Sequence, residues 1–408
     1  MTDEEVIFES LYLCSSRNGV YKSKEFRGYG IKMVNMGELF GYDFIHNQEM
    51  EKISLTESEF QKNDLIDGDL IFGRRSLIES GAGKCCIVVE PQDPLTFESS
   101  IIRVRLNKEK VNPLFYYYYF KSPIGRGRIK ALVSGTNVKG IRSTDLKKIK
   151  VISTKKEVQN KITQKLYYYD LMIGNNLRRI ELLELSARLL YQEWFVRLRF
   201  PGYEHKKIIN GVPEEWNLRL IEEIANCIGG GTPSTVVPEY WNDGTIPWVT
   251  PTDVTRNNHL ILLDSEKKIT EKGLSNSSAK MCPSHAILMT SRASVGFFAI
   301  PVKEVCTNQG FISIVTFDIR WTPYILFHLI SRVEEIRMMG AGSTYPEVSR
   351  GKFRKFRVLI PDKTLIELFG EYVEPLLNQI RTLKKQNQNL RTARDLLLPK
   401  LISGEITV

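Results

Sequence analysis

The sequence repeats itself, and this duplication constrains the fold more than any other feature. Residues 135–151 align without a gap on residues 342–358, and both segments end in an alternation of apolar and basic residues that is typical of a strand with one basic face. Shorter matches precede them in the same order. These are residues 34–39 with 249–254, and residues 69–72 with 285–288. Because the order is kept, we expect two equivalent globular domains.

A long segment with heptad spacing follows each repeat. Its apolar residues stand alternately four and three positions apart, which is typical of a coiled-coil seam. The first seam consists of Ile162, Leu166, Tyr169, Ile173, Asn176, Ile180, Leu183, Ala187, Leu190 and Trp194. The second consists of Ile366, Phe369, Val373, Leu376, Ile380, Leu383, Asn387, Leu390, Arg394, Leu397 and Leu401. One such stripe also fits a core helix of an ordinary domain, but two equivalent stripes favour a pair of long helices.

Prolines and glycines mark the breaks between these segments. Pro375 should loosen the early turns of the second helix, and Pro399 with Gly404 should mark its end. The segment 199–203, Arg-Phe-Pro-Gly-Tyr, is the expected joint between the halves. We therefore predict a mixed α/β (α+β) fold of duplicated globular domains separated by two long helices. The domains are residues 1–155 and 199–360, and the helices are residues 156–198 and 361–408.

Composition narrows the class of partner. The chain has 57 Lys and Arg against 47 Asp and Glu, a formal net charge of +10 and a pI near 9.1, which favours a polyanion and fits either nucleic acid or a membrane surface. No window approaches about 18 uninterrupted apolar residues, and the N-terminus is acidic where a signal peptide is basic. We expect a soluble cytoplasmic protein. The six cysteines show no CxxC spacing, so we expect reduced, mostly buried thiols and no metal site.

Catalytic motifs are absent or false. Residues 112–115, Asn-Pro-Leu-Phe, resemble the amine-holding loop of a DNA methyltransferase, but Leu114 replaces the second proline and no Gly-rich methyl-donor loop is present. A helix start with Pro in the first turn explains them better. Residues 81–84, Gly-Ala-Gly-Lys, resemble a phosphate-binding loop, but Ile78 replaces the first glycine and Cys85 replaces the Ser or Thr that holds magnesium. We expect neither catalysis nor a bound cofactor.

The second half carries a family resemblance. Six segments in this order resemble the DNA-specificity subunits of type I restriction-modification systems, and with the duplication the resemblance covers nearly the whole chain. The segments are residues 213–220, 229–234, 246–254, 288–296, 307–311 and 397–405. The first half lacks the Gly-Gly-Thr-Pro-Ser loop. Its opening, residues 14–26, looks like another subtype of recognition domain, and residues 68–75 are its most family-like segment.

The resemblance implies a non-catalytic reader of a bipartite, asymmetric DNA site. Each recognition domain would present loops to a major groove, and two unlike domains should read two unlike half-sites. The paired helices would hold the domains at a fixed separation. Two methyltransferase subunits would dock on the helix region, and endonuclease/translocase subunits would supply ATP-driven cleavage in the full complex. No membrane partner is expected.

Chemistry sorts the residues that we expect to contact DNA. Basic residues at the strand-like ends of the repeats are candidates to neutralise phosphates. They are Lys147, Lys148, Lys150, Arg354, Lys355 and Arg357. Loop residues are candidates to read bases, because Arg can bridge guanine and Asn or Gln can bridge adenine. They are Arg74, Arg75, Asn137, Lys139 and Arg142 in the first half, and Thr250, Thr252, Asp253, Ser291, Arg292, Asn308, Gln309, Ser343 and Thr344 in the second. A solvated strand face, or polar side chains that brace the fold, would explain the same residues without DNA.

The one Asn in each seam predicts the register of the helices. A polar residue at a core position stabilises a register when it meets another polar group, so Asn176 should face Asn387 in an antiparallel pair. Trp194 then faces Phe369, and Arg394 faces Tyr169 as a cation over a ring. A parallel pair would also align apolar positions, but it would bring both recognition domains to one stretch of DNA.

Three other readings of the sequence stay open. The recognition portion of a fused restriction enzyme would predict a truncated chain, whereas this sequence has a start methionine and a complete second helix. A cytoskeletal or scaffold coiled-coil protein would explain the helices but would leave the duplicated basic domains unexplained. An independent enzyme finds no supporting constellation of residues.

Overall fold

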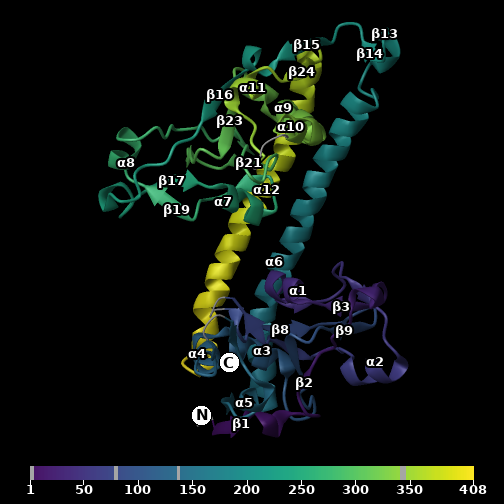
Figure 1. The fold of residues 1–408 in the computed structure, drawn as a ribbon, viewed down its shortest axis with the longest axis vertical. Helices are drawn as coiled ribbons and strands as arrows, with labels where there is room; N and C mark the ends of the chain where they lie inside the picture. Colours follow the sequence, from purple (N-terminus) through teal and green to yellow (C-terminus); the bar gives the residue numbers. More distant parts are fainter. Residues whose placement is uncertain (1–3, 78–80, 136–137, 341–345) are drawn as a thin grey trace. The chain divides into compact units, whose positions relative to one another are not determined.

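The computed structural model describes residues 4–77, 81–135, 138–340 and 346–408. Its contacts divide it into two compact units (Figure 1). The first unit consists of residues 1–171 and 390–408, and the second of residues 172–389. Each unit contains a globular half and a part of both long helices, so each is described by itself. No described helix is both long enough and apolar enough to span a bilayer.

The globular half of the first unit is built around a five-stranded sheet. Its strand order is β2 (Arg17–Asn18), β10 (Ile101–Val104), β6 (Leu70–Gly73), β8 (Cys85–Val88) and β4 (Phe44–Ile45). A three-stranded sheet has the order β5 (Lys52–Ile53), β3 (Arg27–Val34) and β9 (Leu95–Phe97). Two further pairs are β1 (Glu4–Ile7) with β12 (Lys150–Ser153), and β7 (Arg75–Ser76) with β11 (Lys139–Gly140). The helices are α1 (Met36–Gly41), α2 (Glu57–Asn63), α3 (Pro113–Lys121), α4 (Pro123–Lys130) and α5 (Ser143–Leu146).

The second unit repeats the strand order of both sheets and the pair that β1 forms with β12. Its five-stranded sheet has the order β16 (Ala225–Gly229), β23 (Phe311–Thr316), β20 (Ile287–Thr290), β21 (Phe298–Pro301) and β18 (Ile261–Leu262). Its three-stranded sheet has the order β19 (Lys267–Ile269), β17 (Ile246–Val249) and β22 (Cys306–Thr307), and β15 (Asn217–Leu220) pairs with β24 (Arg357–Ile360). A hairpin of β13 (Ile208–Ile209) and β14 (Val212–Pro213) precedes them. The helices are α7 (Pro251–Asn257), α8 (Glu271–Ser275), α9 (Thr322–Ser331), α10 (Val333–Met339) and α11 (Arg350–Arg354). The predicted duplication is confirmed.

The structure corrects the alignment of one repeated strand. Gly73 faces Ile101 in the first half, and Thr290 faces Phe311 in the second. β6 is therefore equivalent to β20 with Gly73 at the position of Thr290, and the predicted match of residues 69–72 with 285–288 is wrong by one residue. Both strands are buried at every position, and such continuous apolar runs align almost equally well in either register.

The predicted strand with a basic face is also wrong in part. The short helices α5 and α11 reach into the segments where these strands are expected. The strands begin only at Lys150 and Arg357. The Ser349 side chain caps α11 by accepting a hydrogen bond from the Lys352 amide, which favours a helical turn over a strand there. Four of the six basic residues predicted on the strands therefore lie outside them. They are Lys147, Lys148, Arg354 and Lys355.

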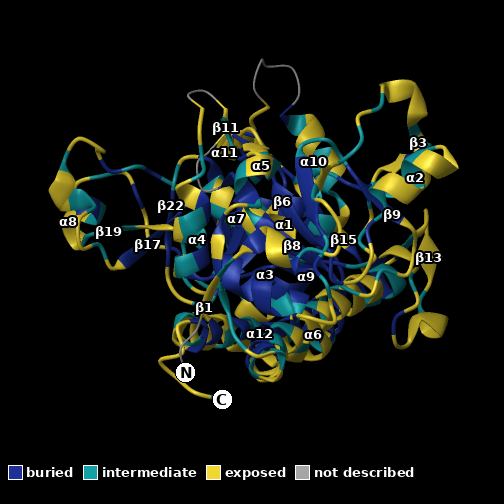
Figure 2. Cartoon of the chain, turned by 90° about the horizontal axis from the view of Figure 1, so that it is seen from below, coloured by how far each residue is buried: buried dark blue, intermediate teal, exposed yellow. Residues whose placement is uncertain are grey.

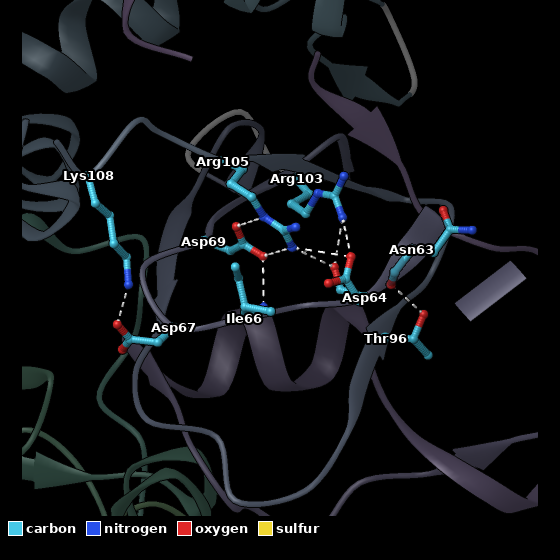
Figure 3. A network of polar contacts seen from close by, with 9 residues as sticks. All are labelled: Asn63, Asp64, Ile66, Asp67, Asp69, Thr96, Arg103, Arg105 and Lys108. Carbon is cyan, nitrogen blue, oxygen red and sulfur yellow. Dashed lines mark hydrogen bonds and ion pairs between the residues drawn. The ribbon is translucent and has the colours of Figure 1, made fainter. Parts of the chain in front are cut away.

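A buried carboxylate braces the sheet of the first half (Figure 3). Asp69 is 0% exposed, and both of its oxygens accept hydrogen bonds from Arg105, at 2.8 Å each. Burial raises the pKa of Asp69, and the Arg105 hydrogen bond opposes that effect. Asp64 lies beside this pair and contacts both Arg103 and Arg105. In the second half, strand register places Ala286 and Val315 where Asp69 and Arg105 stand, so only the first half is braced in this way.

The two long helices continue into the core of each half. They are α6 (Lys156–Tyr191), which leads into a π-helical turn at Gln192–Val196, and α12 (Lys363–Ile402), which Pro375 does not interrupt. Ile180 and Phe369 share one buried cluster with strands of the second unit. Leu166 and Leu398 share another with strands of the first unit and with α3, whose buried aromatic residues are dark blue in Figure 2. The seams are therefore part of both domain cores.

The predicted register is confirmed in the second unit. The Asn176 Nδ2 donates to Asn387 Oδ1 at 2.9 Å, and both side chains are buried. The Asn387 amide also donates to the Ile173 carbonyl at 3.3 Å. The rings of Trp194 and Phe369 lie with centroids 6.0 Å apart, as an antiparallel pair requires.

The predicted partner of Arg394 is wrong by one residue. In the first unit its guanidinium pairs with the Asp170 carboxylate rather than with the ring of Tyr169. The Tyr118 hydroxyl of α3 donates to the same carboxylate at 2.6 Å. A largely buried cation needs a charged, hydrogen-bonded partner more than it needs a ring. This network therefore ties α3 to both long helices within the unit.

The predicted burial of most cysteines is confirmed, since all six are free of disulfides and Cys14 alone among them is exposed.

The amide pair yields the first prediction. Asn387→Leu should lower the free energy of unfolding by about 1–3 kcal/mol, because it leaves the buried Asn176 amide without its partner. The double variant Asn176→Leu with Asn387→Leu should recover that loss, because an apolar pair leaves no unsatisfied group. Chemical denaturation measures both. Asn175→Leu, at an exposed position of α6 next to Asn176, is the control and should change little. A single variant as stable as the wild type would contradict this role of the pair.

Candidate nucleic-acid interface

Three segments meet at one end of β6 in the first half. Arg74 follows the strand, and its amide donates to the Ser100 carbonyl at 2.8 Å. Its carbonyl accepts from the Ile141 amide at 3.0 Å, which brings in the segment before α5. In this short ladder Arg75 stands directly opposite Gly140.

The second half brings the equivalent segments together. The Ser291 amide donates to the Gly310 carbonyl at 2.7 Å, and the Ser291 carbonyl accepts from the Val348 amide at 2.9 Å. Arg292 stands opposite Glu347. Ser291 and Arg292 therefore occupy the positions of Arg74 and Arg75, and Glu347 occupies that of Gly140. The duplication extends to the backbone framework of the loops.

One glycine in each half allows a fourth segment to join. A Cβ on Gly19 would lie 2.1 Å from the Phe97 carbonyl oxygen, and one on Gly230 would lie 1.9 Å from the Asn308 carbonyl oxygen. The next residue in each half continues the contact with a backbone hydrogen bond. The Val20 amide donates to the Phe97 carbonyl, and the Gly231 amide donates to the Thr307 carbonyl. The first half lacks the Gly-Gly-Thr-Pro-Ser sequence, but Gly19 gives it the same close approach.

The loops of the first half carry mainly basic side chains. Arg75 and Arg142 are exposed, and neither side chain has a hydrogen bond or ion pair among the described residues. Arg74 reaches the Ser99 carbonyl at 3.4 Å, and the Lys139 ammonium donates to the Gly135 carbonyl at 2.8 Å. Asn137 lies outside the described residues. These cations come from segments far apart in the sequence and meet at one set of loops.

The loops of the second half carry mostly neutral or internally paired groups. Arg292 pairs with Glu347 at 2.8 Å, and Gln309 accepts from the Thr232 hydroxyl at 2.6 Å. Thr252 is exposed on the first turn of α7. Ser343 and Thr344 lie outside the described residues. The two halves thus present different chemistry on one framework.

Four candidate residues of the second half also brace the fold. Thr250 and Asp253 form a capping box at the start of α7. The Asn308 side chain accepts from the Gly310 amide at 2.9 Å, and Ser291 is 3% exposed. The side chains of Thr250, Asp253 and Asn308 are engaged locally and Ser291 is buried. Arg292, Gln309 and Thr252 are exposed.

The candidate phosphate contacts lie next to this region in each half. Lys147 pairs with Glu9 at 2.9 Å, and Arg354 is half-buried at the end of α11. The remaining members are exposed, namely Lys148, Lys150, Lys355 and Arg357. Within the described part of the chain, none of these four side chains has a hydrogen bond or ion pair, so each is available to a polyanion.

The two misleading motifs have structural roles. Asn112 caps α3 by accepting from the Leu114 amide at 2.9 Å, with Pro113 in the first turn, which confirms the predicted helix start. The Lys84 ammonium donates to the Phe40 carbonyl at 2.8 Å rather than facing an open loop. Among the described residues, no group of three or more His, Cys, Asp and Glu side chains is placed to hold a metal ion.

Sequence reasoning missed Glu347. The alignment of the repeats places Glu347 at the position of Gly140. The match of residues 69–72 with 285–288 is wrong by one residue, so it does not place Arg75 at the position of Arg292. Aligning the two arginines would have revealed a carboxylate facing one and a glycine facing the other.

Comparison with known proteins shows that both halves of the sequence match one family. Residues 8–185 and 213–392 match the type I restriction modification DNA specificity domain. The type I restriction enzyme MjaIX specificity subunit of Methanocaldococcus jannaschii is 31% identical over 199 residues, 48% of this chain and 46% of that protein. The putative MjaX specificity subunit of the same organism is 22% identical over 399 residues, 96% of this chain and 91% of that protein.

The extent of these matches differs. The chain spans less than half of the MjaIX relative and of the HindI specificity subunit of Haemophilus influenzae, at 46% and 42% of their lengths. A crystal structure of a type I restriction-modification S subunit from M. genitalium has a TM-score of 0.57 at 18% identity, covering 98% of this chain and 95% of that one. That likeness supports the fold.

The capping box yields the second prediction. Thr250→Ala should lower the free energy of unfolding by about 1 kcal/mol, because the first amides of α7 lose their cap. Thr252→Ala, at an exposed position of the same helix, should leave stability unchanged. Thermal unfolding of the two variants measures the difference. Equal stability of the two variants would show that the cap contributes nothing and that Thr250 is free for another role.

Proposed function

The chain belongs to the type I restriction-modification DNA specificity family, and from this premise we propose that it reads a bipartite, asymmetric DNA site and directs partner subunits to it. The observation that carries the proposal is the duplicated loop framework, on which two halves present different side chains. A reader of one repeated half-site would need the same side chains twice. Residues 1–155 would form the first recognition domain and residues 199–360 the second.

Side-chain chemistry supports a division of contacts within each domain. In the first, Arg74, Arg75, Lys139 and Arg142 supply donors suited to guanine and to phosphates. In the second, the same framework carries exposed side chains that include both hydrogen-bond donors and acceptors. They are Thr252, Arg292 and Gln309. Lys148, Lys150, Lys355 and Arg357 would neutralise phosphates and thereby position the duplex. Asn137, Ser343 and Thr344 remain proposed contacts on the basis of the sequence.

The chain would take no catalytic part itself. Its two enzyme-like motifs serve as a helix cap and as a lysine bound to a backbone carbonyl. Methylation would come from two methyltransferase subunits, and ATP-driven cleavage from endonuclease/translocase subunits. This assembly would act on DNA in the cytoplasm, without a cofactor of its own.

A leucine stripe on α6 supports docking of the methyltransferase subunits on the helix region. Leu182, Leu185 and Leu189 are 46%, 47% and 47% exposed. Their spacing places them on one side of the helix, away from the seam residues Ile180 and Ala187, which are 0% exposed. A row of half-exposed leucines on a charged helix is suited to burial against another protein.

The third prediction tests recognition. Cells that carry this chain with its methyltransferase subunit should show methylated adenines in a two-part asymmetric motif, and deletion of the chain should abolish them. Replacing residues 215–355 with the equivalent domain of a relative should change one half-site only, because each domain reads its own segment. Single-molecule sequencing of the genomic DNA measures both outcomes. Methylation that is independent of the chain, or a swap that alters both half-sites, would contradict the proposal.

The fourth prediction tests docking. The triple variant Leu182→Gln, Leu185→Gln and Leu189→Gln should weaken methyltransferase binding by at least about tenfold, since three apolar contacts are lost. Titration calorimetry with the purified methyltransferase measures the affinity. Leu218→Gln is the control, because Leu218 is 60% exposed but lies on β15. Unchanged affinity of a folded triple variant would rule out this face as the docking site.

A further inference from the structure

Two equivalent arginines face different partners in the two halves. Arg75 stands opposite Gly140 in the first half, and Arg292 stands opposite Glu347 in the second. The surrounding hydrogen bonds agree, since Arg74 and Ser291 make the same two backbone contacts on the preceding position. Among the described residues Arg75 has no hydrogen-bond or ion-pair partner. At these two equivalent arginines, the halves therefore differ by one facing carboxylate.

The geometry of the second pair leaves part of the guanidinium available. The Arg292 Nε donates to Glu347 Oε1 at 2.8 Å, while its two terminal nitrogens have no partner among the described residues. The side chains are 51% and 45% exposed, so the pair lies at the surface. The backbones are held together as well, because the Ala293 amide donates to the Pro346 carbonyl at 3.0 Å.

An arginine held in this way can bind in fewer orientations than a free one. A guanidinium can present either Nε with one terminal nitrogen, or both terminal nitrogens, to a pair of acceptors. With Nε occupied by Glu347, only the two terminal nitrogens remain. The O6 and N7 of guanine form such a pair of acceptors at the edge of the major groove.

We propose that Glu347 is a positioning residue that makes Arg292 a guanine reader in the second half-site, an inference that rests on the proposed DNA-reading function. Glu347 also neutralises the charge of Arg292, so this arginine contributes to discrimination more than to the general attraction for phosphates. Among the residues that the structure describes, the Arg75 side chain has no such partner, and its cation contributes to both. The presence of Glu347 in one half, where the other half has Gly140, thus gives the equivalent residues Arg292 and Arg75 different roles.

The test compares three variants of the chain in its complex with the methyltransferase subunits. Glu347→Ala should reduce discrimination at one G·C pair of the second half-site by about tenfold, because Arg292 is no longer oriented. Glu347→Gln keeps an oxygen that accepts from Nε and should restore that discrimination. Arg292→Ala should lose it entirely. Methylation rates on DNA duplexes that carry each base at each position measure the effect, and the first half-site should stay unchanged in all three variants.

Two controls separate positioning from charge and from folding. Glu204→Ala removes one exposed negative charge from the segment between the halves and should leave discrimination intact. Thermal unfolding of all variants should match the wild type, since an exposed ion pair contributes little to stability.

Two results would overturn the inference. The first is unchanged base discrimination in Glu347→Ala. The second is a loss of discrimination in Glu347→Gln as large as in Glu347→Ala, because charge alone would then explain the effect. If the wild-type chain directs no methylation to any site, the proposed function itself fails, and this result is distinct from both.

Discussion

Burial of the apolar seam between α6 and α12 is the constraint on which each unit depends. In the second unit Ile180 and Phe369 belong to the same buried cluster as the sheet residues Ile287 and Ile312. In the first unit Leu166 packs in one cluster with Phe72. The helices cannot separate within a unit without opening the core of the globular half. Each half is therefore fixed on its own portion of the helices.

Buried polar contacts give this packing a unique register. The Asn176–Asn387 hydrogen bond pairs the buried side-chain amide of one helix with the side-chain carbonyl oxygen of the other. In the second unit the Tyr191 hydroxyl and His328 Nδ1 lie 2.9 Å apart and join α6 to α9, and burial lowers the pKa of His328 to about 3. In the first unit the Asp170 carboxylate meets both Arg394 and Tyr118. Apolar contacts tolerate small shifts, whereas these pairs do not.

The sequence predicts those elements whose signals are periodic, and it fails where a short local contact decides. The heptads predict both helices and, through one Asn in each, their register. The strand predicted at Lys147 and Lys148 is instead the turn that follows a short helix, because the alternation of apolar and basic residues fits a helical turn as well as a strand. The heptad pattern cannot predict that Arg394 pairs with Asp170, since Asp170 is not a seam residue. The loop residues are found by resemblance, but the bracing roles of Thr250 and Asn308 need coordinates.

The central claim is that equivalent loops of the two halves read different half-sites. Site-specific photocrosslinking tests it most directly, with a photoreactive amino acid placed at Arg75 or at Arg292 in the chain bound to its methyltransferase subunits and DNA. The claim predicts a crosslink from position 75 to one half-site and from position 292 to the other, each mapped to a single short segment. Crosslinks from both positions to the same half-site, or to the spacer between them, would contradict it.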